Sequence, residues 1–211
     1  MKADGSNAVQ ILLLVGGLAL LPAVLFSVTG FTRILIVLGF IRSGLGTPTA
    51  PPNQVLVGIA LFLTLFVMTP TIQAVKHEAI DPLSHNQISQ AQALKRAEEP
   101  MREFMFKQTR TKDLALMVKL AKMPRPKTRA DVPTTVLVPA FIISELKTAF
   151  QIGFLIFLPF LVIDLIVSST LMSMGMMMLP PVFISLPFKI LLFVLVDGWE
   201  LVTGSLVRSF H

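Results

Sequence analysis

The 211-residue chain is 54% hydrophobic and only 14% charged, with a net charge of +6 and a mean hydropathy of +0.76. These values exclude an ordinary soluble globular protein and indicate an all-α, integral membrane-type protein of one domain. The absence of cysteine excludes a disulfide framework, a thiolate nucleophile and cysteine-based metal sites.

The first apolar run predicts a membrane-spanning helix. Residues 8–32 carry no charge and are numerous enough to cross a bilayer. The run is too long, and too rich in Phe and Leu at its end, for a secretory signal, so we expect it to belong to the fold. Arg33 interrupts the run and residues 34–41 continue it. Because Arg33 has no partner nearby in the sequence, we expect its side chain to snorkel toward a membrane interface.

A break rich in Gly and Pro then predicts the turn of a helical hairpin. Residues 43–53, SGLGTPTAPPN, contain two Gly and three Pro. Residues 54–75 form a second uncharged run of spanning length, with Pro70 as an expected kink or exit. The sequence therefore predicts a first apolar hairpin over residues 8–75.

Residues 76–133 have a different character and predict a charged helical insert. Residues 76–131 hold twelve Lys and Arg against seven Asp and Glu, which is +5 of the total charge. The pattern predicts an amphipathic helix over 86–109, broken or kinked at Pro100, another over 113–122, and a proline-rich loop over 123–133. Acids alternate with bases along these helices, so we expect a solvated surface and no nucleic-acid partner.

Residues 134–211 predict a second apolar hairpin whose arms contain charges and are kinked at Pro159 and Pro187. Asp164 and Lys189 lie ~16 and ~12 Å along helices from the intervening turn, so we expect them to meet as an ion pair. The alternative is that one of them is solvated at an interface.

Glu145 and Lys147 stand two residues apart, ~200° around a helix, and therefore cannot serve one face. We expect one of them to point inward and the other toward a neighbouring chain or an interface. The 16 uncharged residues between Lys147 and Asp164 indicate that these charges mark the two ends of a span.

The turn between the two arms is built from methionines. Met176, Met177 and Met178 follow Gly175 and precede two prolines, a combination that neither a helix nor a strand can absorb. Methionine is flexible and polarizable, which suits a surface that must close and reopen. The alternative is an apolar turn with no further role.

Catalytic and metal motifs are missing from the sequence. There is no H-E-x-x-H, G-x-S-x-G or G-x-x-x-x-G-K-[ST], and His77 and His85 are separated by Pro82 and lack a third ligand. We therefore expect no enzyme activity and no cofactor.

Four stretches together resemble the FliP family of flagellar type III export-gate proteins, which is homologous to the R component of injectisome export machines. They are FTRILIVLGFIRSGLGT (31–47), PPNQVLVGIALFLTLFVM (51–68), SELKTAFQIGF (144–154) and MGMMMLPPVFISLPFKILLFVLVDGWELVTGSL (174–206). The resemblance covers nearly the whole chain. GTPTAPPNQ and the double proline favour the flagellar branch. Flagellar members usually begin with a cleaved signal peptide, absent here, which leaves the injectisome alternative open.

The resemblance implies a structural, pore-forming subunit of the gate through which unfolded flagellar proteins cross the bacterial inner membrane at the flagellar basal body. It implies a pentamer, contacts with membrane lipid and with Q-type and R-type subunits of the flagellar export apparatus, and a seal formed by Met176, Met177 and Met178. It also associates Phe104 and Glu145 with subunit contacts. With these we group Lys147, the charged neighbour of Glu145.

Two questions stay open at this stage. Loop charge would place the basic insert in the cytoplasm, whereas the family topology places it in the periplasm, and we follow the family. A small-solute transporter or ion channel, with Asp164 and Lys189 as a coupling site, is the alternative from another functional class. It is disfavoured because the two halves show no inverted repeat.

Overall fold

The computed structural model describes residues 15–16, 19, 22, 25–176 and 178–210. Helices make up most of this part of the chain and it contains no strand, which confirms the all-α prediction. The helices are α2 (Phe31–Leu45), α3 (Asn53–Val75), the π-helical turn η1 (Lys76–Ile80), α4 (Asp81–Ser84), α5 (Gln90–Gln108), α6 (Thr111–Leu120), the 3-10 turn η2 (Arg129–Asp131), α7 (Thr134–Ser173), α8 (Pro181–Leu195) and α9 (Gly198–Arg208).

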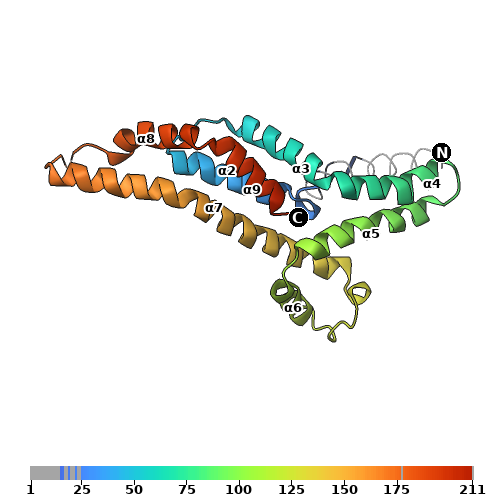
Figure 1. Cartoon of the computed structure of the whole chain (residues 1–211). Helices are drawn as coiled ribbons and strands as arrows, with labels where there is room; N and C mark the ends of the chain where they lie inside the picture. Colours follow the sequence, from blue (N-terminus) through green and yellow to red (C-terminus); the bar gives the residue numbers. More distant parts are fainter. Residues whose placement is uncertain (1–14, 17–18, 20–21, 23–24, 177, 211) are drawn as a thin grey trace, which may run out of the picture.

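The molecule is elongated, with α7 running along much of its length (Figure 1). At one end α8 returns beside α7, and at the other α5 runs back beneath α3 and α4, while α6 projects to one side. Helix α2 lies in the middle and packs chiefly on α7. The two predicted hairpins therefore pack together through one helix from each.

The first hairpin differs from the prediction at both ends. Much of the run predicted over 8–32 lies outside the described residues, and the chain bends at Thr29 and Gly30 before α2 begins. Pro70 is neither an exit nor an end, because α3 continues past it into the π-helical turn and α4 as far as Ser84. Proline removes one backbone hydrogen bond, and the rest of the helix tolerates that loss here.

The second hairpin contains a 40-residue helix, α7, which passes through Pro139, Pro159 and both Glu145 and Lys147 without ending. Pro187 likewise lies inside α8. The interruption occurs instead at Asp197, whose φ of 49° is left-handed and where α8 and α9 meet at 64°. The prolines therefore do not divide this hairpin.

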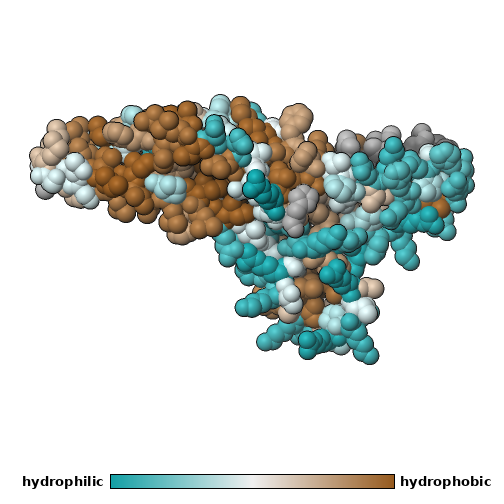
Figure 2. Space-filling model, in the orientation of Figure 1, coloured by the Kyte–Doolittle hydropathy of each residue, from teal (hydrophilic) through white to brown (hydrophobic). Residues whose placement is uncertain are grey.

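Among the described residues, two helical stretches are long and apolar enough to cross a membrane, 53–84 and 134–173, or three if the bent pair α8 and α9 counts as one. The four long segments expected from the sequence are thus not all continuous, since α2 has only 15 residues. Figure 2 shows apolar side chains gathered over the α7–α8 end and hydrophilic ones over α4, α5 and α6.

The first amphipathic helix of the insert, predicted over 86–109, begins four residues later, at Gln90. Ser89 caps α5 by accepting a hydrogen bond from the Gln92 amide, while the Gln92 side chain accepts one from the Ser89 amide. This reciprocal capping box fixes the start of the helix at Gln90. Pro100 lies inside α5 without ending it.

Two glycines allow α2 and α7 to approach closely. A Cβ atom on Gly153 of α7 would lie 2.3 Å from the Phe40 ring, and one on Gly44 of α2 would lie 2.6 Å from the Phe160 ring. Each helix therefore receives a phenyl ring from the other where it has no side chain. This interlocking fixes the register of the main helix pair.

We predict that Gly153→Ala lowers the free energy of unfolding by about 1–3 kcal/mol, because the Phe40 ring must move out of its place. Gly39→Ala in α2 is the control, since a Cβ there meets nothing within 4 Å and gains helix propensity. Denaturation in mild detergent measures both variants. An equal change in the free energy of unfolding in both variants would show that Gly153 is not needed to receive the Phe40 ring.

Candidate functional site

A buried arginine joins four segments of the chain. The Arg33 side chain of α2 is 2% exposed and that of Glu145 of α7 is 1% exposed. The Nε of Arg33 donates to Glu145 Oε2 at 3.0 Å, and Nη2 donates to Oε1. Nη1 donates to the Ser209 carbonyl at 2.8 Å and to its hydroxyl at 3.0 Å, and Nη2 to Gln108 Oε1 at 3.0 Å. All five guanidinium donors are thereby used.

The expectation that Arg33 snorkels to an interface is therefore wrong. A fork-shaped guanidinium with a carboxylate opposite can be buried, whereas a lone cation would have to reach water. No sequence signal singles out this pair, because Lys147, Asp197 and Glu200 also remain in the apolar runs once Asp164 and Lys189 are matched.

The last residues of the described chain close this network. Gln108 Nε2 donates to the Phe210 carbonyl at 2.9 Å, and the Phe210 ring lies 3.9 Å from the Arg33 guanidinium carbon. A Cβ on Gly30 would lie 2.5 Å from the Phe210 ring, so only glycine fits there without movement. Phe104 of α5 is also buried, with its ring 6.4 Å from that of Phe210 and 6.0 Å from that of Phe141.

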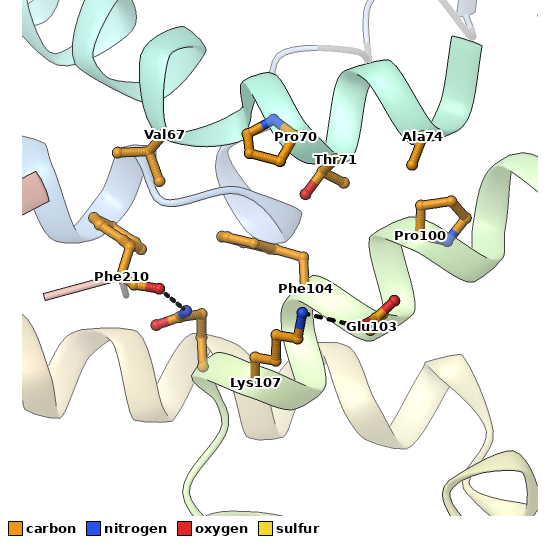
Figure 3. A pocket seen from close by; sticks show the side chains of 10 residues that line it. Val67, Pro70, Thr71, Ala74, Pro100, Glu103, Phe104, Lys107 and Phe210 are labelled. Atoms are coloured by element: carbon orange, nitrogen blue, oxygen red, sulfur yellow. Dashed lines mark hydrogen bonds and ion pairs between the residues drawn. The ribbon is translucent and has the colours of Figure 1, made fainter. Parts of the chain in front are cut away.

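A groove of about 520 Å³ lies beside this network, between α3, α5 and Phe210. In Figure 3, Phe104 points from α5 toward α3, and the ion pair of Lys107 and Glu103 lies on the same stretch of α5. Phe104 and Glu145, which the resemblance associates with subunit contacts, thus have partners within their own chain.

Lys147 points away from Glu145, as the two-residue spacing requires. Its ammonium pairs with Asp113 of α6, whose side chain is buried and also accepts a hydrogen bond from Ser144 at 2.9 Å. Burial raises the pKa of Asp113, but the hydrogen bonds from Lys147 and Ser144, with the charges of Lys147 and Arg110, outweigh burial and hold that pKa below its usual value. This cluster fastens α6 to α7.

The structure brings Asp164 and Lys189 together across the second hairpin. Lys189 Nζ donates to Asp164 Oδ2 at 2.6 Å, and the buried Ser185 hydroxyl donates to Oδ1 at 2.6 Å. The Lys189 ammonium also lies close to Gly46, at the C-terminus of α2. A helix C-terminus carries partial negative charge, so this position favours the cation. The pair thus links α7, α8 and α2.

The methionine turn forms one end of the molecule (Figure 1). Helix α7 ends in a Schellman motif, in which the Met176 amide donates to the Leu171 carbonyl and the Gly175 amide to the Met172 carbonyl. Gly175 has a left-handed φ of 74°, which glycine adopts freely. Met178 is 98% exposed and Met176 43% exposed, whereas Met177 lies outside the described residues.

The described residues offer no metal site, since no three His, Cys, Asp or Glu side chains among them are grouped closely enough to hold an ion. The Nδ1 atom of His77 lies 3.5 Å from the Asp81 carboxylate, and the Nδ1 atom of His85 lies 2.7 Å from the Asp81 carbonyl oxygen. Their contacts are those of a local helical turn.

The chain is similar in sequence to flagellar proteins. A profile described as the FliP family matches residues 14–206. The flagellar biosynthetic protein FliP of Bacillus subtilis (strain 168) is 60% identical over 97% of this chain and 93% of its own length. The protein of the same name from Pectobacterium carotovorum is 59% identical (97% and 79%), and that from Aquifex aeolicus is 47% identical (97% and 87%).

We predict that Arg33→Met and Glu145→Met each lower the free energy of unfolding by about 3–5 kcal/mol, because each leaves a buried charge unpaired. The double variant should cost less than the sum of the two by more than about 1 kcal/mol. Lys107 and Glu103, an exposed pair 2.9 Å apart, provide the control cycle, with an expected coupling below about 1 kcal/mol. Equal coupling in the two cycles would contradict the role of Arg33.

We predict a pH dependence from Asp113. Its pKa is lower in the folded than in the unfolded chain, so its contribution to stability is present above the unfolded pKa of about 4 and is lost as the pH falls through the folded value. At neutral pH, Asp113→Asn should cost about 1–2 kcal/mol, and thermal unfolding curves of variant and parent should converge below about pH 4. Glu99→Gln, at an exposed site on α5, is the control. Curves that stay parallel would refute the prediction.

Proposed function

Because the chain belongs to the FliP family, we propose that it is a structural, non-enzymatic subunit of the flagellar protein export gate in the bacterial inner membrane. The names of its relatives favour flagellar biosynthesis over an injectisome. The helices of spanning length in the described part of the chain and the extensive apolar surface support a membrane location. Within the gate, the subunit forms part of the channel entry for unfolded flagellar proteins.

The observation that carries this proposal is the exposed methionine turn at the end of the apolar hairpin. A helical hairpin held by the Asp164–Lys189 pair presents Met176 and Met178 at its tip. Thioether side chains have several rotatable bonds and no charge. A ring of such turns closes around a passing chain of any sequence and excludes ions by leaving no polar path.

A seal of this kind requires several copies, since one turn cannot surround a channel. The α7 and α8 helices leave many large apolar side chains uncovered within the chain, more than a monomer needs to expose. They include Phe150, Phe154, Leu161, Leu165, Ile166, Phe183, Phe188 and Leu191. We propose that lipid, Q-type and R-type subunits and neighbouring copies in a pentamer cover them, and that the Arg33–Glu145 network with Phe104, and Lys147 through α6, hold the contact surfaces in shape.

We predict that replacing Met176, Met177 and Met178 together by Ala raises the ion conductance of membranes holding the assembled gate. Shortening three side chains opens the constriction without touching the ion pairs that hold the hairpin. Conductance of reconstituted vesicles measures the leak, and native mass checks that assembly is unchanged. The expected increase is about tenfold or more.

Met172→Ala is the matched control, because Met172 is an exposed methionine in the last turn of α7 and not in the run 176–178. It should leave the conductance at the parent level. An intact assembly whose conductance is the same with and without the three methionines would refute the seal.

A further inference from the structure

The insert carries a cleft that has no part in the proposed function. It has a volume of about 610 Å³ and lies between α6, the end of α5 and the loop over residues 123–132. Its apolar lining includes Phe106, Leu114, Val118, Met123 and Val132. The size is that of a site for a small ligand or one or two inserted side chains.

Four cations surround this apolar floor. Lys119, Arg125, Lys127 and Arg129 line the cleft and are exposed, and none of the lining residues is acidic. Of the acids nearby, Asp113 is buried against Lys147 on α7. The Asp131 carboxylate accepts hydrogen bonds from loop amides. Glu103 pairs with Lys107 and also interacts electrostatically with Arg129. The residues that line the cleft therefore carry an excess of positive charge around an apolar centre, which favours a ligand that is acidic and has an apolar anchor.

The loop that forms one wall is held in place before any ligand arrives. The Asp131 carboxylate accepts hydrogen bonds from the backbone amides of Lys127 at 3.0 Å and Thr128 at 2.8 Å. Arg102 of α5 donates to the carbonyls of Val132 at 2.7 Å and Arg129 at 3.3 Å. A wall ordered in advance lowers the entropy cost of binding.

The position of the cleft favours a peptide over a lipid as its ligand. Figure 2 shows hydrophilic side chains over the projecting α6 region, well apart from the apolar surface at the α7–α8 end. A lipid with its acyl chain in this cleft would have to lie far from the part of the molecule that suits a bilayer core. A polypeptide reaches such a surface without that constraint.

We propose that this cleft docks an acidic peptide segment of a partner protein, with one apolar side chain in the cavity and carboxylates on Lys119, Arg125, Lys127 and Arg129. The surface lies on α6 and the loop that follows it, which project from the side of the molecule and not from the end that carries the methionine turn (Figure 1). Docking here can therefore be tested independently of any role of that turn in sealing.

The test uses the full chain in neutral detergent and a short fluorescent synthetic peptide of Glu and Leu residues, with binding read by anisotropy. One companion peptide has Gln in place of Glu, and another has Ser in place of Leu. We expect the Glu/Leu peptide to bind at least about tenfold more tightly than either companion, and more weakly as salt rises.

Three variants separate the contribution of the charges from that of the apolar cavity. Arg125→Glu with Lys127→Glu should weaken binding by about tenfold or more, while Lys95→Glu with Arg96→Glu, an equal charge change at exposed sites on α5, should leave it within about twofold. Ala115→Trp, which fills the cleft from an exposed lining position, should abolish the preference for Leu over Ser.

Equal binding of the Glu and Gln peptides would overturn the proposal, and so would equal losses in the two charge variants. Tighter binding to phosphatidylglycerol vesicles, lost in Arg125→Glu with Lys127→Glu, would assign the cleft to lipid instead. A change in native mass that tracks the same variant would assign it to a second copy. Any of these results leaves the conductance test of the methionine turn unaffected.

Discussion

Burying the Arg33 guanidinium costs several kcal/mol unless its charge and its five donors all find partners, and three other segments of the chain provide them. Glu145 comes from the long helix, Gln108 from the insert, and Ser209 from the C-terminal end. Each must be in register for the network to close. The packing of α2 on α7 and the path of the last residues follow from that requirement.

The other polar contacts repeat the same arrangement on a smaller scale. Asp113 with Lys147 fastens the insert to α7, and Asp164 with Lys189 fastens α8 to α7. Helices that are apolar on nearly every side can slide against one another, because nonpolar contacts carry little directional information. A few buried charges at defined positions remove that freedom. The methionine turn thus extends from a frame whose helices are fixed in register.

The sequence predicts the features that depend on residues close together in the chain. Apolar runs and the charged insert predict an all-helical chain, and the two arms of one hairpin place Asp164 opposite Lys189 because few residues separate them. Arg33 and Glu145 are 112 residues apart, and no periodicity relates them. The tolerance of α3 for Pro70, and the bend at Asp197, depend on packing that a sequence pattern does not contain.

In the proposed gate, methionine turns from several copies meet around one channel. The most direct measurement is disulfide formation in the assembled gate with a single cysteine at position 178, since the chain has no cysteine of its own. Mild oxidation should yield covalent dimers from Met178→Cys, and none from Lys95→Cys on the exposed face of α5. A fully assembled gate whose Met178→Cys subunits stay monomeric under oxidation would show that the turns do not meet.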